Sequence, residues 1–326
     1  MSLKLNILKI LEDNRDKYTS GVVLAKKLSV SRGAIWKAIE SLRIDGYSIS
    51  AATNNGYRLD VSGDILTVAG ITKNLKTSGV FLVEVRETVN STNTILRELA
   101  MKGMPEGFVL AADGQTAGKG RQGRRFYSPA GHGAYFSLLL RPGVGSGAAH
   151  LITAAAAVAS AQAIEQVVGV NVGIKWVNDL LLDGKKVCGI LTEAAYCMER
   201  GMIDSAVLGV GINITKPETG YPPEIEDVAT ALTDRRGGFE GERCRLIAAV
   251  LDNFWGFYKD LTSRKFLEEY RQRSVLTGKE ILVLTDSIKV PARAIGIDDS
   301  CGLMVRYEDG RTAILSTGEV SIRGSF

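Results

Sequence analysis

A glycine-rich, cationic segment, residues 114–125 (GQTAGKGRQGRR), lies between two apolar stretches that are typical of strands. Three of its glycines, Gly118, Gly120 and Gly123, formally match the G-x-G-x-x-G pattern of dinucleotide-binding folds. That pattern needs a helix to begin at the third glycine, so that the helix N-terminus holds the pyrophosphate. Here Pro129 follows before a helix could begin. The sequence therefore argues against a Rossmann unit and predicts a flexible cationic loop over an anionic ligand. A solvated basic surface loop is the alternative.

Composition sets the broad class of the chain. Its 326 residues suggest two or three domains, and 45% hydrophobic with 23% charged residues is typical of a globular protein. Four cysteines without a C-x-x-C pair, and two histidines, give little material for zinc, so no metal site is predicted. No export signal is visible, and the most apolar run, residues 148–164, is mainly alanine. We therefore expect a buried helix there, and a cytoplasmic protein with reduced thiols.

The first sixty residues carry the excess positive charge. They hold ten of the 40 Lys and Arg residues but six of the 36 Asp and Glu residues, so the net charge of +4 lies here. Helical apolar spacing predicts three helices with a tight turn before the third, which is a helix-turn-helix. Ser31 is the expected N-cap of the third helix and Gly46 its expected end. The run Asn54-Asn55-Gly56 then predicts a hairpin, so the module carries a β-wing.

Two functions fit a winged helix with this charge. The first is DNA binding, with the start of the third helix in the major groove and the wing near phosphate. The residues predicted to contact DNA are Ser31, Arg32, Gly33, Trp36, Lys37 and Arg58. The alternative is a protein-interaction or dimerisation module. The charge favours DNA, and Trp36 is ambiguous between a groove contact and a core anchor.

The central part alternates apolar strands with helices. A helix is expected after a cap at Ser91 or Thr92. Strands are expected at 80–86, 107–113, 133–142, 172–176, 187–194 and 205–214. Gly209 and Gly211 in the last strand are expected to leave room for a flat ligand, and Asn213 offers an amide.

Lys175 ends one of these strands, close to Asn178 and Asp179. A lysine against a mostly buried sheet is costly unless it faces an anion, so it is a candidate for contact with an anionic ligand. A structural ion pair between Lys175 and Asp179 is the alternative.

Other chemistry finds less support. The chain has no G-x-S-x-G elbow, and with His132 and His150 as its histidines a Ser-His or Cys-His pair is poorly supported. Many cations and a few amides suggest a reaction of anionic partners, in which charge develops on phosphate, rather than covalent nucleophilic catalysis.

Five segments together closely resemble the bifunctional biotin–protein ligases, which in many bacteria double as the repressor of the biotin operon. They are STN (91–93), QTAGKGRQGRRFYSP (115–129), KWVNDLLLDGKKVCGILTE (175–193), GVGIN (209–213) and GEVSIR (318–323). Each segment alone is a weak signal, but their order and spacing are specific. With the winged helix ahead of them, the resemblance covers the chain from end to end.

The resemblance implies an α+β chain with three domains joined by one linker. A winged helix-turn-helix occupies 1–62 and a linker 63–79. A class II synthetase-like mixed sheet with helices, the biotin- and ATP-binding catalytic domain, occupies 80–273. An SH3-like β-barrel occupies 274–326, where short strands broken by Gly, Asp and Pro turns agree.

The resemblance also implies a two-step reaction. Biotin's carboxylate attacks the α-phosphate of Mg-ATP and gives biotinyl-5′-adenylate, after which a lysine of a biotin carboxyl carrier protein takes the biotin and AMP leaves. Mg²⁺ is expected to arrive with ATP, with no tightly bound cofactor. The adenylate-loaded chain is expected to form a homodimer that binds operator DNA and represses biotin genes.

Site residues follow from the same match. Lys175 and Arg121 are implied as catalytic. The biotin side is assigned to Ser91, Thr92, Asn93, Gln115, Lys119, Gly120, Arg121 and Lys175. The ATP or adenylate side is assigned to Gly118, Lys119, Arg121, Arg124, Asn178 and Asn213.

The sequence departs from the family pattern at three positions. Lys119 stands where the family usually has arginine, which keeps the charge but loses the planar fork. Val177 replaces the usual proline, and Phe126 replaces a common tryptophan. Two rival readings stay open: a lipoate or octanoate ligase on the same fold, and a non-catalytic, ligand-sensing transcription factor.

Overall fold

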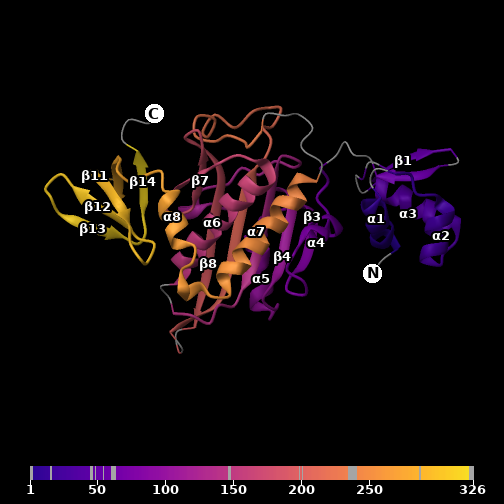
Figure 1. The fold of residues 1–326 in the computed structure, drawn as a ribbon, viewed down its shortest axis with the longest axis horizontal. Coiled ribbons are helices and arrows are strands. Elements are labelled where there is room, and N and C mark those ends of the chain that lie inside the picture. Colours follow the sequence, from indigo (N-terminus) through magenta and orange to yellow (C-terminus); the bar gives the residue numbers. More distant parts are fainter. Residues whose placement is uncertain are drawn as a thin grey trace.

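The structure is a computed structural model. It describes residues 3–14, 17–44, 47, 49–53, 55–59, 64–145, 148–197, 199, 201–233, 241–285 and 288–322. Three units follow one another along the long axis in Figure 1: an N-terminal helical unit, a central sheet with helices, and a C-terminal sheet. The predicted α+β class is confirmed.

The N-terminal unit is a helix-turn-helix with a wing. It consists of α1 (Leu3–Asp13), α2 (Gly21–Leu28) and α3 (Arg32–Ile44), followed by the antiparallel strands β1 (Ile49–Ala52) and β2 (Gly56–Leu59). Ser20 and Ser31 begin α2 and α3, because their hydroxyls accept the backbone N–H groups of Val22 and Ala34. Apolar residues of all three helices form a separate core. The predicted positions Gly46 and Asn54 lie outside the described residues.

The central unit is built on a seven-stranded mixed sheet in the order β3-β4-β5-β9-β8-β7-β6. β3 and β4 are parallel and the other neighbours antiparallel. The strands are β3 (Leu82–Val89), β4 (Phe108–Gln115), β5 (Gly133–Leu140), β6 (Gly173–Lys175), β7 (Asp179–Leu182), β8 (Lys185–Cys197) and β9 (Met202–Asn213). The strands expected from the sequence are therefore confirmed, with shifts of a few residues at their ends.

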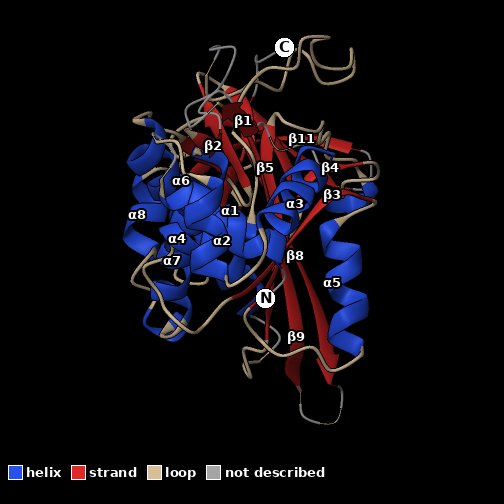
Figure 2. Cartoon of the chain, turned by 90° about the vertical axis from the view of Figure 1, so that its right-hand side faces the viewer, coloured by secondary structure: helices blue, strands red, loops and turns tan. Residues whose placement is uncertain are grey.

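Helices cover both faces of this sheet, as Figure 2 shows. α5 (Thr92–Met101) packs on one face, while α6 (Ala148–Val168) and α7 (Glu242–Tyr258) pack on the other. The stretch Ala149–Val168 is long and apolar enough to cross a membrane by length and composition, but 67% of it is buried inside the fold. The buried helix that the sequence predicts at 148–164 is thus confirmed.

The segment between the first two units packs on α7. It contains α4 (Val68–Asn74), and Asp252 of α7 accepts two backbone N–H groups that follow this helix. At the start of α7, Arg243 is 2% exposed and bonds both to Asp64 and to Asp113 of β4. The connection to the winged helix is therefore tied to the sheet that carries the site.

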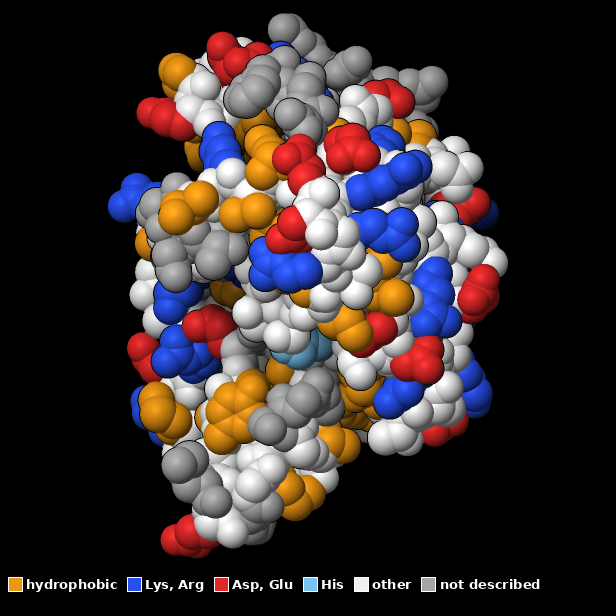
Figure 3. Space-filling view, turned by 90° about the vertical axis from the view of Figure 1, so that its left-hand side faces the viewer, with side chains coloured by type: hydrophobic (Ala, Val, Ile, Leu, Met, Phe, Trp, Pro, Cys, Tyr) orange, Lys and Arg blue, Asp and Glu red, His pale blue; other side chains and the backbone are white. Residues whose placement is uncertain are grey.

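The C-terminal unit is a five-stranded antiparallel sheet in the order β13-β12-β11-β10-β14. Its strands are β10 (Glu280–Thr285), β11 (Ile288–Ile297), β12 (Leu303–Tyr307), β13 (Thr312–Leu315) and β14 (Glu319–Ile322). The Trp176 indole N–H donates to the Cys301 carbonyl oxygen at 2.8 Å, which docks this sheet beside β6. α8 (Leu267–Gln272) adds a second link, since Arg271 donates to the Ile297 carbonyl. Figure 3 shows acidic and basic side chains mixed on this end of the molecule.

Candidate active site

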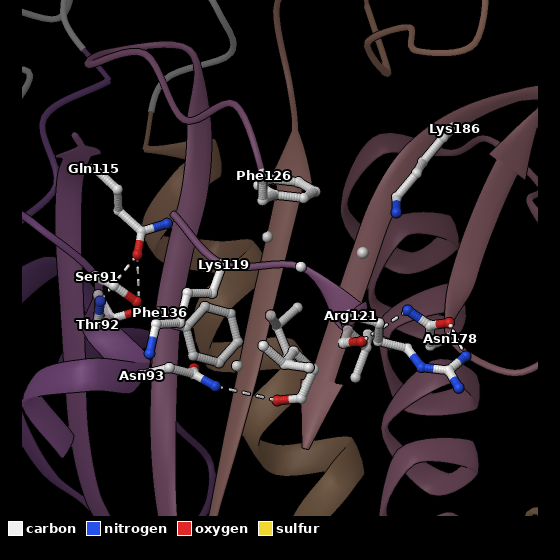
Figure 4. A pocket seen from close by; sticks show the side chains of 17 residues that line it. Ser91, Thr92, Asn93, Gln115, Lys119, Arg121, Phe126, Phe136, Asn178 and Lys186 are labelled. Atoms are coloured by element: carbon white, nitrogen blue, oxygen red, sulfur yellow. Dashed lines mark hydrogen bonds between the residues drawn. The ribbon is translucent and has the colours of Figure 1, made fainter. Parts of the chain in front are cut away.

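A pocket opens where the N-terminus of α5, the middle of the sheet and the loop after β4 meet (Figure 4). It is lined by Ser91, Thr92, Asn93, Gln115, Lys119, Gly120, Arg121, Phe126, Phe136, Asn178, Lys186, Gly189, Ile190, Leu191, Gly209, Val210 and Gly211. The glycine-rich cationic segment and three of the other four ligase-like segments of the sequence thus meet around one cavity. Its two ends differ in chemistry.

The neutral end of the pocket is formed by Thr92, Asn93 and Gln115. Ser91 caps α5, so the helix presents its first residues to the cavity. The Gln115 side-chain oxygen accepts the Thr92 backbone N–H at 2.9 Å and lies 3.2 Å from the Thr92 hydroxyl. The Gln115 amide nitrogen donates to Ser128 at 2.9 Å. These bonds fix uncharged donors and acceptors in place before any ligand arrives.

A second layer supports this neutral end. The Ser137 hydroxyl of β5 lies 2.7 Å from the Thr92 hydroxyl and 2.6 Å from Asn93 Oδ1. Asn93 Nδ2 donates to Glu193 Oε2 of β8 at 2.9 Å. The Asn93 side chain fits because Gly209 lies beneath it: a Cβ there would stand 2.1 Å from Asn93 Oδ1.

The cationic end is formed by Arg121 and Lys186, whereas Lys119 lies nearer to Asn93 and Phe136 (Figure 4). Arg121 donates to Asn178 Oδ1 at 3.1 Å, while the Asn178 amide nitrogen donates to the Ile190 carbonyl. Lys186 Nζ lies 2.6 Å from Asp179 Oδ1, with its side chain 31% exposed. Two cations at one end of a cavity form a site for carboxylate and phosphate oxygens.

The loop that carries Lys119 and Arg121 folds back on itself. The Gly120 N–H donates to the Arg124 carbonyl at 2.7 Å and the Phe126 N–H to the Gly118 carbonyl at 2.9 Å, around one 3₁₀ turn (Arg121–Gly123). A Cβ on Gly118 would stand 2.4 Å from the Phe126 carbonyl oxygen, so this close approach requires glycine. The loop joins β4 to β5 as predicted, which confirms that it is not a dinucleotide fingerprint.

Phe126 closes the pocket over the sheet. A Cβ on Gly211 would stand 2.5 Å from its ring, and one on Gly189 2.9 Å. Gly209 and Gly211 both line the pocket, and the expectation that they leave room for a flat ligand stays a prediction. They make room for the side chains of Asn93 and Phe126, which in turn shape the cavity.

Four residues that the sequence assigns to the site do not line the pocket: Lys175, Gly118, Arg124 and Asn213. Asn213 instead donates to the Thr230 carbonyl, which ties down the loop after β9. The alternative of a Lys175–Asp179 ion pair is wrong, because the partner of Asp179 is Lys186. Lys186 lines the pocket although the sequence pattern assigned this role to Lys175, which ends a predicted strand in the same motif.

Burial affects three other ionisable groups near the site. It raises the pKa of the Cys188 thiol and that of the Tyr135 hydroxyl, so neither serves as a nucleophile at neutral pH. Burial, together with the Arg121 guanidinium, lowers the pKa of His150. The positive charge of the site therefore comes from lysine and arginine.

Five of the six residues predicted to contact DNA are exposed on the N-terminal unit. Ser31, Arg32, Gly33 and Lys37 are exposed, and Trp36 is 55% exposed. Trp36 is therefore not a core anchor. Arg58 of the wing is half-buried, with its guanidinium 4.8 Å above the Tyr18 ring.

Three protein-family models match the chain. They describe an HTH domain (residues 4–58), the biotin/lipoate A/B protein ligase family (85–213) and a biotin protein ligase C-terminal domain (277–323).

Whole-chain relatives agree with these models. The chain is 34% identical over 322 residues to the bifunctional ligase/repressor BirA of Bacillus subtilis. The aligned residues cover 97% of each protein. Its identity to the protein of that name from Escherichia coli is 26%, over 95% of this chain and 94% of the relative. Among solved structures, the biotin protein ligase from Aquifex aeolicus in complex with biotin and ATP matches with a TM-score of 0.60 and 26% identity, over 74% of this chain and 98% of that one.

Proposed function

The chain belongs to the biotin–protein ligase family, in the group of bifunctional ligase/repressors, and from this we propose that it adenylates biotin and transfers it to a carrier-protein lysine. The observation that carries the proposal is the division of the pocket into two ends. Biotin has a neutral cyclic urea at one end and a carboxylate at the other, which match the neutral and cationic ends described above.

We propose the following roles in the first step. Thr92, Asn93 and Gln115 hold the urea, so the carboxylate lies near Arg121 and Lys186. One carboxylate oxygen attacks the α-phosphorus of ATP, the bond to the bridging oxygen breaks, and pyrophosphate leaves. Cations fixed around the reacting oxygens stabilise the charge that develops there, and closure of the loop excludes water from the mixed anhydride.

In the second step a neutral amine of the carrier lysine attacks the acyl carbon of the adenylate. AMP leaves with the electrons of the carbon–oxygen bond, and the amine loses a proton as the amide forms. The acceptor we propose is a biotin carboxyl carrier protein, and the expected compartment is the cytoplasm.

Lys186 is the lysine that we propose for contact with the carboxylate and phosphate, because it lines the pocket. The assignment of Lys175 stays a prediction. For the nucleotide we keep Gly118, Arg124, Asn178 and Asn213 as candidates, in addition to the loop cations.

Mg²⁺ would enter with ATP. Within the described residues, no group of three or more His, Cys, Asp or Glu side chains is placed to hold a metal ion. The donors that Mg²⁺ prefers would therefore come from the phosphates and water. Bound there, it would neutralise the phosphate charge.

The decisive experiment measures pyrophosphate release from Mg-ATP with biotin, lipoate or octanoate as the acid. Release with biotin alone supports the proposal. Release with lipoate would keep the fold and overturn the substrate, and release with none of the acids would favour a ligand-sensing repressor. Transfer to a purified carrier domain then separates a ligase from a protein that only forms adenylate.

For regulation, we propose a homodimer that forms when adenylate is bound and places two winged helices on operator DNA. The support lies in β8: in the part of the chain that the structure describes, its residues 192–196 pair with β9 on one side and with no strand on the other. An unpaired strand edge can add a second copy of the same edge. Operator titrations with and without biotin and ATP test this, and equal affinity would exclude adenylate as corepressor.

A further inference from the structure

We propose that Arg243, at the start of α7, is a positioning residue that fixes the base of the loop between β4 and β5. This loop, residues 116–132, carries Arg121 and Phe126 into the pocket (Figure 4). Arg243 itself does not line the pocket. The inference rests on the proposed function, in which the loop closes over the adenylate, and it identifies what holds the loop in place for that closure.

The two strands that carry the loop separate before they reach it. Their ladder ends at the pair of Ala112 and Tyr135. One further bridge joins Gln115 to Ser128. Between these two pairs, two residues of β4 face six residues of the returning chain. Such unequal lengths interrupt a ladder, so the two sides do not pair with each other at the base of the loop.

The Arg243 side chain joins the two sides at this place. Its Nε donates to the Gly133 carbonyl at 2.7 Å, on the β5 side. On the β4 side, Nη1 donates to the Asp113 carboxylate and Nη2 to the Asp113 carbonyl at 3.3 Å. Arg243 is 2% exposed, so these bonds are made away from water. One guanidinium therefore sets the distance between the two sides, which its rigid planar fork makes possible.

Arg243 is held in turn by the segment that leads to the winged helix. The Asp64 carboxylate accepts the Arg243 backbone N–H at 3.0 Å, in the first turn of α7. Nη1 also donates to the Asp64 carbonyl at 3.3 Å. A carboxylate at this position satisfies a helix N–H that has no partner within the helix. The arginine that fixes the loop therefore has its own backbone fixed at the end of α7.

The neutral end of the pocket has other supports. Gln115 continues the parallel ladder with β3, and its side chain accepts the Thr92 N–H. Arg121 lies farther along the loop, where it bonds to Asn178 across the pocket. Loss of the Arg243 fork should therefore displace the loop cation and leave the urea site in place.

The experiment uses the full chain with Arg243→Lys. Lysine keeps the charge, but its single ammonium cannot bond to both strands as the planar fork does. We expect kcat for adenylation to fall about tenfold and the adenylate to dissociate about tenfold faster, because catalysis depends on accurate placement. Biotin Kd, from titration calorimetry, should stay within about twofold because the interaction lost is made only in the closed state.

Arg141→Lys is the matched control. Arg141 follows the opposite end of β5, and its guanidinium also donates to two backbone carbonyls, those of Ala100 and Met104. This variant should lose stability in thermal unfolding as Arg243→Lys does, but keep kcat and adenylate release unchanged. If Arg243→Lys does not fold, Asp113→Asn keeps the arginine and weakens its partner, and the same two changes should appear at about threefold.

A double-mutant cycle with Arg121→Ala tests whether Arg243 acts through the loop. In the Arg121→Ala background, Arg243→Lys should lower kcat by less than a further twofold or so, about the limit of additivity. Additive effects, an unchanged kcat, or a rise in biotin Kd equal to the loss in kcat would each overturn the positioning role. A wild-type chain that releases no pyrophosphate with biotin and Mg-ATP would instead overturn the proposed function.

Discussion

The two ends of the pocket are built in opposite ways. At the neutral end Thr92 and Asn93 are 3% and 4% exposed, and their polar atoms bond to protein partners. At the cationic end the Lys186 side chain is 31% exposed beside Asp179. A buried hydrogen-bond network is fixed in advance and costly to disturb, whereas a half-solvated ion pair contributes little until water is excluded.

This contrast suggests that the two ends of the pocket contribute to different steps, binding and catalysis. The neutral end supplies ground-state recognition, since its geometry exists before the ligand binds. The cationic end supplies stabilisation that becomes large when the loop closes and the local dielectric falls. Substitutions at the two ends should therefore divide between KM and kcat, and the predictions below test that division.

The largest effect is expected for Lys186→Gln. Removal of a cation from the reacting oxygens should lower kcat for adenylation by about 10²–10³, while biotin Kd changes less than about fivefold. Lys175→Gln, measured in the same single-turnover assay, is the matched comparison because it removes one lysine from β6, which β7 separates from β8 in the same sheet. A loss confined to Lys175→Gln would restore the sequence-based assignment and remove Lys186 from the mechanism.

Thr92→Val should affect biotin binding more than kcat, the opposite of Lys186→Gln. The change keeps the side-chain shape but leaves Ser137 and Gln115 with one partner fewer in a buried place, so biotin affinity should fall about 10- to 50-fold. KM for ATP should stay within about twofold in pyrophosphate release. If kcat fell and biotin Kd did not change, the neutral end would have no role in ground-state binding.

Ionic strength should affect the two ends of the pocket differently in the unmodified chain. Exposed cations are screened by ions, so kcat/KM for ATP should fall several-fold between low and high ionic strength. Affinity for biotinamide, which lacks the carboxylate, should be nearly constant because it uses the buried neutral end. Equal salt dependence of the two measurements would show that the ends are not distinct.

The sequence predicted much of this site, because its signals are local. Ser91 is a recognisable cap, and the loop glycines are required by close backbone approaches such as that of Gly118 to Phe126. Lys119, Gly120 and Arg121 lie in the pocket as predicted. The helix-turn-helix could be predicted for the same reason, since apolar spacing and caps are read within one helix.

What the sequence could not give depends on contacts between distant segments. Lys175 lies on β6 and Lys186 on β8, with β7 between them, and of the two only Lys186 lines the cavity. The link from Asn93 to Glu193 joins residues one hundred positions apart. Gly209 and Gly211 were identified as space-making residues, but the side chains that occupy the space come from α5 and the loop.

The smallest effect is expected for Lys119→Arg, which restores the residue usual in the family. Lysine offers a compact charge, whereas arginine can bond two oxygens of one carboxylate or phosphate with its planar fork. Because the position is exposed in the open pocket, the gain should be confined to the loaded state. We expect the adenylate to dissociate about two- to fivefold more slowly, with biotin Kd unchanged. Adenylate release, followed by competition with unlabelled adenylate, measures this, and faster release would show that Lys119 already fits its anion better than arginine can.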